Sequence, residues 1–165
     1  MTVILGPGSP RRRELLAQLG VDFTIASPDI DEDVIPGEQP VPYVQRLAVA
    51  KAHAIPAPAD ALVIAADTTV DLDGEILAKP LDADEARSML RRLSGRTHAV
   101  HTGLAVRLGE QTVSEVVTSL VTFVELSEPD LDWYVGTGEP IDKAGAYAVE
   151  GAGGAVVERV EVSVS

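Results

Sequence analysis

The sequence contains no cysteine, which excludes disulfides, thiolate metal sites and a cysteine nucleophile. Basic residues are scarce: 13 Lys and Arg stand against 26 Asp and Glu, giving a net charge of -13 at pH 7. So acidic a surface repels nucleic acid and anionic lipid, and we expect neither as a partner. No apolar run is long enough for a membrane span and no signal peptide is recognisable, so we expect a cytoplasmic protein.

The chain has 165 residues, 45% of them hydrophobic, which suits one globular domain with a full core. Strand-like and helix-like patterns alternate along it, and this alternation indicates an α/β fold. The expected strands are 2–6, 21–26, 61–66, a hairpin over 70–77 that turns at Asp73-Gly74, 97–108, 112–125 and 155–165. The expected helices are 10–19 (ended by Gly20), 41–54, 83–93 (with an Asp82/Glu85 capping box) and 127–135.

The N-terminal segment LGPGSPRRRELL, residues 5–16, reads as a strand end, a tight turn and a helix start that carries Arg11, Arg12 and Arg13. Backbone N–H groups are free at a helix N-terminus and the dipole is positive there, so basic side chains are disfavoured unless an anion lies among them. A solvated arginine patch is one interpretation, and a cradle for phosphate groups is the other. On a chain this acidic, a phosphate ligand has to be bound by such local clusters.

Asp67 follows the apolar run 61–66, which reads as a buried central strand. Ligands of open α/β sheets bind beyond the carboxyl ends of strands, so Asp67 could hold Mg²⁺ or act as a general base; it could also simply cap a turn. The loop expected over 28–40 is rich in carboxylates and could add a second metal ligand, although most of it should be solvated. Its acidic residues include Asp29, Asp31, Glu32 and Asp33.

Other polar residues are less specific on their own. Lys51 and Lys79 could each be an ordinary surface lysine. His98 and His101 are three apart on a strand and so face opposite sides, which argues against a shared metal and for a structural hydrogen-bonding role of His98. The loop 142–147 could shape a pocket for a flat ring. Taken together, the arginines, the strand carboxylate, the acidic loop and the lysines suit metal-assisted attack of water on a phosphoanhydride.

Seven motifs in order carry a family resemblance: SPRR (9–12), the acidic pair Asp31-Glu32, RLAVAKA (46–52), AADTTV (65–70), AKP (78–80), LSGRTHAVHTG (93–103) and GEPIDKAGAYAVEG (138–151). In these motifs the chain resembles the Maf family of nucleoside triphosphate pyrophosphatases, also called septum formation inhibitor proteins. The resemblance runs from residue 3 to the C-terminus.

This resemblance implies one domain over 1–165, with a mixed-sheet α/β fold like that of inosine triphosphate pyrophosphatases (Maf/Ham1) and a cleft between two lobes. It also implies hydrolysis of a nucleoside triphosphate to the monophosphate and pyrophosphate with Mg²⁺ or Mn²⁺, and a homodimer. Asp67 matches the proton acceptor, and Glu32 and Asp67 match metal positions. The positions around the phosphates and the metal are Ser9, Arg11, Arg12, Glu32, Lys51 and Lys79.

Substrate choice in this family follows three positions, here Arg11, Thr68 and Glu150. The branch acting on dTTP and UTP has Arg, Thr and Gln, whereas the branch acting on 7-methyl-GTP tends to Trp, Gln and Glu. Two of three positions favour dTTP and UTP. The Glu150 carboxylate only accepts hydrogen bonds and would suit donors on a purine, so a purine-type (7-methyl-GTP or ITP-like) pyrophosphatase is an alternative. A non-catalytic regulator of septum formation, acting through a protein partner, is another.

Two departures from the family pattern stand out. The first motif usually begins Leu-Ala-Ser, and Pro7 replaces that serine here, which removes a hydroxyl and an N–H from one phosphate contact. Family members usually continue through an Asn-Val-Val-Gly-Leu-Pro segment and a final helix, so the resemblance implies that a C-terminal segment is missing after Ser165.

Overall fold

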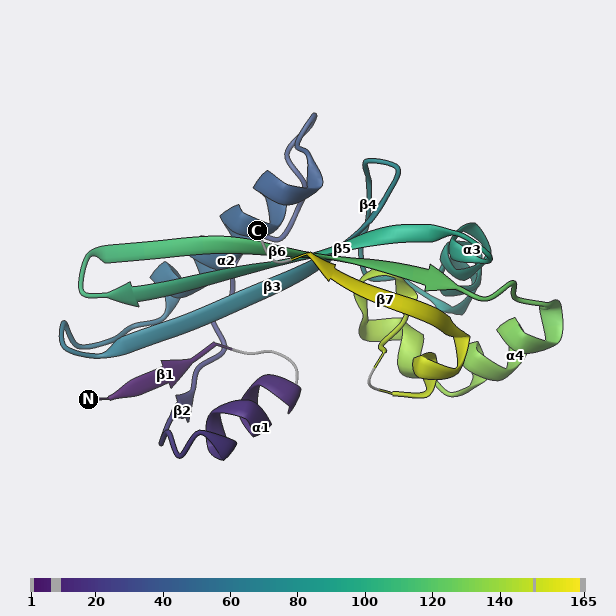
Figure 1. Ribbon diagram of the computed structural model, residues 1–165. Coiled ribbons are helices and arrows are strands. Elements are labelled where there is room, and N and C mark those ends of the chain that lie inside the picture. The colour runs from purple at the N-terminus through teal and green to yellow at the C-terminus, as the bar shows by residue number, and fades with distance from the viewer. Residues whose placement is uncertain (1, 7–9, 150, 164–165) are drawn as a thin grey trace. The chain divides into compact units, whose positions relative to one another are not determined.

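The computed structural model describes residues 2–6, 10–149 and 151–163, and for residues 10–12 and 163 the backbone alone (Figure 1). The strands are β1 (Val3–Leu5), β2 (Thr24–Ile25), β3 (Leu62–Leu72), β4 (Glu75–Leu77), β5 (Thr97–Leu108), β6 (Gln111–Phe123) and β7 (Val157–Ser163). The helices are α1 (Pro10–Gln18), α2 (Pro40–Ala54), α3 (Ala83–Leu93), α4 (Glu128–Gly136) and three short 3₁₀ turns, η1 (Glu139–Asp142), η2 (Ala144–Ala146) and η3 (Ala152–Val156). Among these helices none is both long and apolar enough to cross a membrane.

The strands form a mixed sheet in the order β2-β1-β3-β5-β6-β7, with β4 paired to β3. β1 runs parallel to β2 and β3, while β3–β4 and β6–β7 are antiparallel. The chain divides into two compact units: unit 1 is Met1–Asp67 with Thr102–Val116, and unit 2 is Thr68–His101 with Val117–Ser165. The long strands β3, β5 and β6 contribute residues to both units. The mixed-sheet α/β prediction is therefore confirmed.

Unit 1 is built around helix α2, whose fully buried side chains recur every three or four residues and so form one apolar face: Val44, Leu47, Ala48 and Ala52. The helix begins at Pro40, in the first-turn position where a missing N–H costs nothing, and ends before Ile55 and Pro56. The core cluster of this unit consists largely of small side chains: Ile4, Ala48, Ala52, Ile55, Ala61, Val63, Ala65 and Ala105.

The end of α1 confirms the expected glycine stop. Gly20 has a φ of 75°, its N–H donates to the Ala17 carbonyl, and the Val21 N–H donates to the Leu16 carbonyl. This pair of bonds is a Schellman motif, which satisfies carbonyls that the helix leaves unpaired. By contrast, the strand expected over 21–26 is only two residues long, and both Thr24 and Ile25 are exposed.

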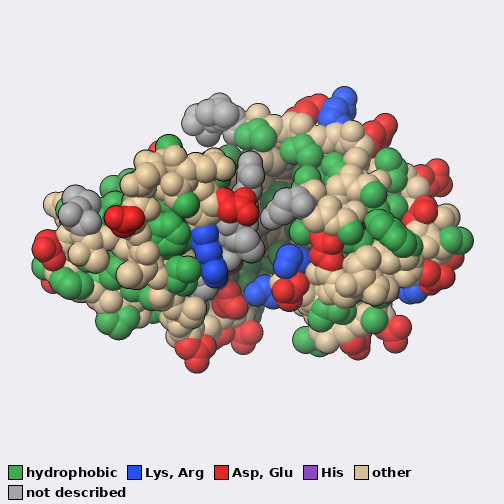
Figure 2. Space-filling view, turned by 90° about the horizontal axis from the view of Figure 1, so that it is seen from below, with side chains coloured by type: hydrophobic (Ala, Val, Ile, Leu, Met, Phe, Trp, Pro, Cys, Tyr) green, Lys and Arg blue, Asp and Glu red, His purple; other side chains and the backbone are tan. Residues whose placement is uncertain are grey.

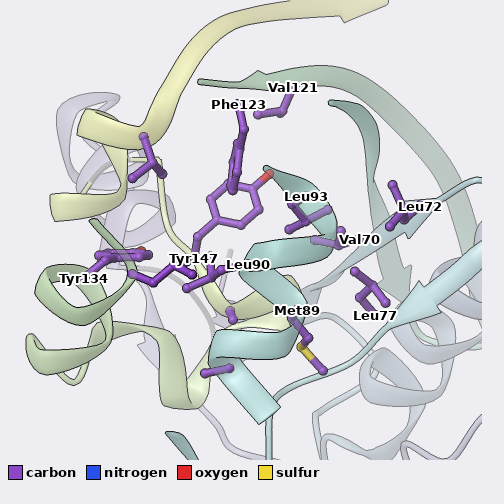
Figure 3. Packing of buried hydrophobic residues seen from close by; sticks show 14 residues of the cluster. Val70, Leu72, Leu77, Met89, Leu90, Leu93, Val121, Phe123, Tyr134 and Tyr147 are labelled. Atoms are coloured by element: carbon purple, nitrogen blue, oxygen red, sulfur yellow. The ribbon is translucent and has the colours of Figure 1, made fainter. Parts of the chain in front are cut away.

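Unit 2 has a larger and more aromatic core (Figure 3). The buried face of α3 (Ala86, Met89, Leu90 and Leu93) packs there with Val70, Leu72 and Phe123. The rings of His98, Phe123 and Tyr147 meet edge to face, with centroids 4.7–5.4 Å apart. The apolar area of these side chains provides most of the cohesion of the unit.

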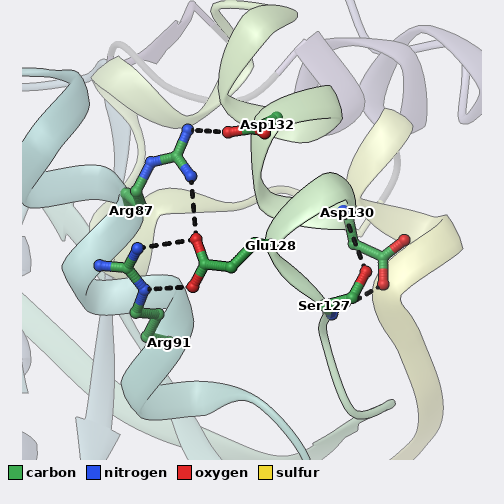
Figure 4. A network of polar contacts seen from close by, with 6 residues as sticks. All are labelled: Arg87, Arg91, Ser127, Glu128, Asp130 and Asp132. Atoms are coloured by element: carbon green, nitrogen blue, oxygen red, sulfur yellow. Dashed lines mark hydrogen bonds and ion pairs between the residues drawn. The ribbon is translucent and has the colours of Figure 1, made fainter.

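Helices α3 and α4 are joined by charged side chains (Figure 4). Arg91 donates two hydrogen bonds to the Glu128 carboxylate, and Arg87 contacts both Glu128 and Asp132. Ser127 and Asp130 form a reciprocal capping box at the start of α4. At the start of α3 the Asp82 carboxylate accepts a hydrogen bond from the Glu85 N–H. This is the first of the two bonds of the expected capping box, and the reciprocal bond from Glu85 is not seen among the described residues.

The turn between β3 and β4 is also as expected, since Asp73 and Gly74 both have positive φ, 52° and 89°. These values fit a type I′ turn, in which an Asp-Gly pair is favoured. The prediction that β3 ends before Asp67 is wrong. The strand continues to Leu72, because Thr68, Thr69 and Val70 are β-branched residues that favour an extended backbone.

Close packing of α2 on β5 makes a first prediction. A Cβ added at Gly103 would lie 2.6 Å from the Val44 carbonyl oxygen, so Gly103→Ala should lower the free energy of unfolding by about 1–3 kcal/mol. Urea unfolding measures this. Gly136→Ala is the matched control, because nothing lies within 4 Å of its added Cβ, and it should leave stability unchanged or slightly raised. Equal midpoints for the two variants would contradict the close approach.

The buried imidazole of His98 makes a second prediction. Burial lowers the pKa of His98 from 6.5 to about 4, so the folded protein keeps the ring neutral where the unfolded chain takes up a proton. The neutral ring therefore contributes its full share of stability above pH 6.5. As the pH falls toward 4, the free energy of unfolding should decrease by up to about 3 kcal/mol. Unfolding free energies of wild type and His98→Gln between pH 7 and 4 test this. The wild-type curve should fall more steeply, and parallel curves would contradict the assignment.

Candidate active site

The candidate site begins with Asp67, which lies within β3 and is the last β3 residue of unit 1. The strand-end argument that singled it out is therefore wrong. The Asp67 side chain is 18% exposed, so solvent reaches it, and its carboxylate contacts the Lys51 ammonium. A turn-capping role is excluded, because no turn follows Asp67.

Lys51 joins two carboxylates. Its Nζ lies 3.1 Å from Asp67 Oδ1 and 3.1 Å from Glu32 Oε1, and its side chain is 12% exposed. The surface-lysine interpretation of Lys51 is thus wrong. A lysine ammonium placed between two carboxylates offsets the repulsion between them, which favours this arrangement.

Helix α2 and β3 supply this geometry. Lys51 lies in the last turn of α2, whose apolar face packs on the alanine-rich core, and Asp67 follows the buried Ala65 and Ala66 of β3. Glu32 comes from the acidic segment, defined here as residues 28–39, which joins β2 to α2. Figure 2 shows acidic side chains distributed over the face in view, in keeping with the excess of Asp and Glu.

Tyr43, one of the residues that sequence reasoning did not single out, is adjacent to this cluster. Its hydroxyl donates to the Glu32 carbonyl oxygen at 2.7 Å, and burial, followed by the charges of Asp67 and Glu32, raises the pKa of Tyr43 to about 12. The hydroxyl therefore stays protonated and remains a donor at neutral pH. The signal in the sequence was its spacing of eight residues from Lys51, two turns of the same helix.

The other predicted site residues lie elsewhere or outside the described part. Thr68 follows Asp67 on β3, within unit 2. Lys79 is exposed in unit 2 after β4, and its charge helps to lower the pKa of Asp142, where a hydrogen bond from Lys143 is the larger cause. Ser9 and Glu150 lie outside the described residues. Arg11 and Arg12 are in the first turn of α1, where only the backbone is described.

The histidines behave as their spacing predicts. His98 Nε2 lies 2.6 Å from the Tyr147 hydroxyl, which confirms its structural hydrogen-bonding role. His101 instead contacts Asp71 and Thr118 across the sheet, each at 2.8 Å. The two rings have different partners and share no site. Throughout the described residues no group of three or more His, Asp or Glu side chains is arranged to hold a metal.

The oxygen chemistry of Glu32 and Asp67 nevertheless fits a hard divalent cation. Mg²⁺ is commonly held in proteins by one or two carboxylates together with substrate phosphates rather than by a full cage of side chains. Two carboxylates that converge on one lysine provide such a partial set of ligands.

Sequence comparisons place the chain among the Maf-like proteins. A sequence profile of the family described as "Maf-like protein" matches residues 2–165, and the chain belongs to that family. It is 54% identical to a dTTP/UTP pyrophosphatase of Anaeromyxobacter dehalogenans (strain 2CP-1 / ATCC BAA-258), over 99% of this chain and 84% of that one. It is 52% identical to a dTTP/UTP pyrophosphatase of Myxococcus xanthus (strain DK1622), over 99% and 83% of the two chains.

A solved structure supports the fold independently. A HAM1 protein from Coxiella burnetii superposes with a TM-score of 0.51 at 18% sequence identity, over 74% of this chain and 73% of that one. The likeness confirms the expected fold class, and at this level of identity it concerns the fold alone.

Proposed function

We propose that this chain hydrolyses nucleoside triphosphates, dTTP and UTP above others, to the monophosphate and pyrophosphate. The observation that carries the proposal is the Glu32–Lys51–Asp67 cluster, in which one lysine ammonium contacts two carboxylates. The dTTP/UTP pyrophosphatases at 52–54% identity support the substrate class. The proposed role is removal of excess or non-standard nucleotides from the precursor pool.

In this proposal Asp67 takes a proton from the attacking water, whose oxygen then bonds to phosphorus. The bridging P–O bond between the α- and β-phosphates breaks, and the electron pair leaves with pyrophosphate. A carboxylate accepts the proton at the moment of attack, which is how a general base lowers the barrier. Lys51 keeps Asp67 fixed in orientation and offsets the negative charge that accumulates in the patch.

We further propose that Glu32 and Asp67 hold Mg²⁺ or Mn²⁺, which when bound would offset charge on the phosphate oxygens. Ser9, Arg11, Arg12 and Lys79 are proposed to bind the phosphates, on the strength of the motifs that contain them. A homodimer is proposed on the family resemblance, and a cytoplasmic location is proposed on the sequence patterns described above.

A panel of dTTP, UTP, CTP, GTP, ITP and 7-methyl-GTP, assayed for pyrophosphate with Mg²⁺ or Mn²⁺, tests the activity. Turnover concentrated on dTTP and UTP is the expected result. Turnover concentrated on a purine would replace the substrate assignment, and no release from any nucleotide would overturn the proposed activity in favour of a non-catalytic regulator.

The role of Asp67 makes a third prediction. Asp67→Asn should lower kcat at least about 100-fold, because an amide cannot accept the proton from water. Asp71→Asn is the matched control: it is on the same strand and its carboxylate is also hydrogen-bonded, but its partners are His101 and the Gly74 N–H. Circular dichroism establishes that both variants are folded. Retained turnover in a folded Asp67→Asn protein would rule out the general-base role.

Glu150 makes a fourth prediction, from the sequence alone. Glu150→Gln restores the residue typical of the dTTP/UTP branch and offers both a donor and an acceptor to a pyrimidine edge. The ratio of kcat/KM for dTTP to that for GTP should rise about 10-fold. An unchanged ratio would show that position 150 does not read the base in this chain.

A further inference from the structure

The acidic segment supplies Glu32 but contains no helix or strand of its own. A side chain on such a segment keeps a fixed position only if other groups hold the backbone near it, and small displacements of catalytic groups are costly in rate. The bonds that hold the acidic segment therefore bear directly on whether Glu32 faces Lys51.

One of these bonds comes from Tyr43 in the first turns of α2. Tyr43 is 7% exposed, and its hydroxyl donates to the carbonyl oxygen of Glu32 itself at 2.7 Å. This part-buried hydrogen bond restrains the backbone at the residue that contacts Lys51.

Arg46, one helical turn later, holds the neighbouring residues. Its Nε and Nη2 donate to the two Glu38 carboxylate oxygens at 2.8 and 2.9 Å, and Nη2 also donates to the Asp33 carbonyl at 3.0 Å. Glu38 in turn accepts the N–H of Ile35 at 3.1 Å. The planar guanidinium thus binds the acidic segment at two places, the Glu38 carboxylate and the Asp33 carbonyl. Its carbon Cζ also lies 5.7 Å from the centre of the Tyr43 ring.

We propose that Tyr43 and Arg46 are positioning residues that hold the backbone of residues 32 and 33, and thereby keep the Glu32 carboxylate against Lys51. All of these residues belong to unit 1. The inference rests on the proposed function for its catalytic consequence, because it assigns these side chains an effect on turnover through Glu32. Its structural part, the restraint of the acidic segment, stands on the contacts alone.

The fifth prediction concerns the variants Tyr43→Phe and Arg46→Lys. The first removes one hydroxyl, and the second keeps the charge but loses the fork that reaches Glu38 and the Asp33 carbonyl together. Each variant should lower kcat about 10-fold, and KM for the nucleotide should change less than that. Each should also need a higher Mn²⁺ concentration to reach its half-maximal rate. Without any ligand, amide hydrogen exchange over residues 31–36 should become faster in both.

Matched controls separate positioning from a general loss of stability. Ser114→Ala also removes one hydroxyl that contacts α2, since Gln45 Nε2 donates to Ser114 Oγ at 2.9 Å in the same unit. Arg87→Lys also removes an arginine fork, the one between α3 and α4. Both controls should keep wild-type turnover and wild-type exchange over residues 31–36.

A double-variant cycle with Glu32→Gln gives the decisive comparison. If Tyr43 acts through Glu32, adding Tyr43→Phe to Glu32→Gln should lower kcat by less than 2-fold beyond the single variant. Independent, multiplying losses would overturn the proposal, as would wild-type exchange over residues 31–36 in both Tyr43→Phe and Arg46→Lys. If the wild type releases no pyrophosphate, the proposed function fails, and the exchange data still decide whether these two side chains hold the acidic segment.

Discussion

The candidate site depends on how closely helix α2 packs on the strands of unit 1. At Gly103 of β5 there is no room for a Cβ, because the Val44 carbonyl of α2 occupies that space. The small side chains of the core, among them Ala48, Ala52 and Ala65, permit the same closeness along the helix. Because α2 lies so near the sheet, Lys51 in its last turn reaches Asp67 on β3 directly, and Tyr43 in its first turns reaches the acidic segment.

Much of the fold could be predicted from local patterns. The 3.6-residue periodicity of α2 and α3, the Gly20 stop and the Asp73-Gly74 turn each act within a few residues, and the structure confirms them. The length of β3 could not be predicted in this way. The apolar run ends at Ala66, but the β-branched residues after Asp67 keep the chain extended, and pairing with β4 continues to Leu72.

The site was predictable as a set of residue types but not as a geometry. Asp67, Lys51 and Glu32 were singled out, yet the reason given for Asp67, a strand end, was wrong. Nothing in the sequence indicated that one lysine would contact both carboxylates, because Glu32 lies in a segment without regular structure. The contacts of Tyr43 and Arg46 were not predicted, because the Glu32 and Asp33 carbonyls belong to the backbone and Glu38 lies in a segment without regular structure.

The two units differ in what their cores are made of. The core cluster of unit 1 consists of alanine, isoleucine and valine, and Leu5, Tyr43 and Leu47 are also buried in that unit, whereas the core cluster of unit 2 includes Leu, Met, Phe and Tyr. An alanine removes far less apolar area from water than a leucine or a phenylalanine, so the alanine positions of the unit 1 cluster each contribute less hydrophobic free energy. The Glu32–Lys51–Asp67 cluster belongs to unit 1. A ligand that binds only the folded form of this unit would do more than occupy a site, because its binding free energy would add to the free energy of unfolding.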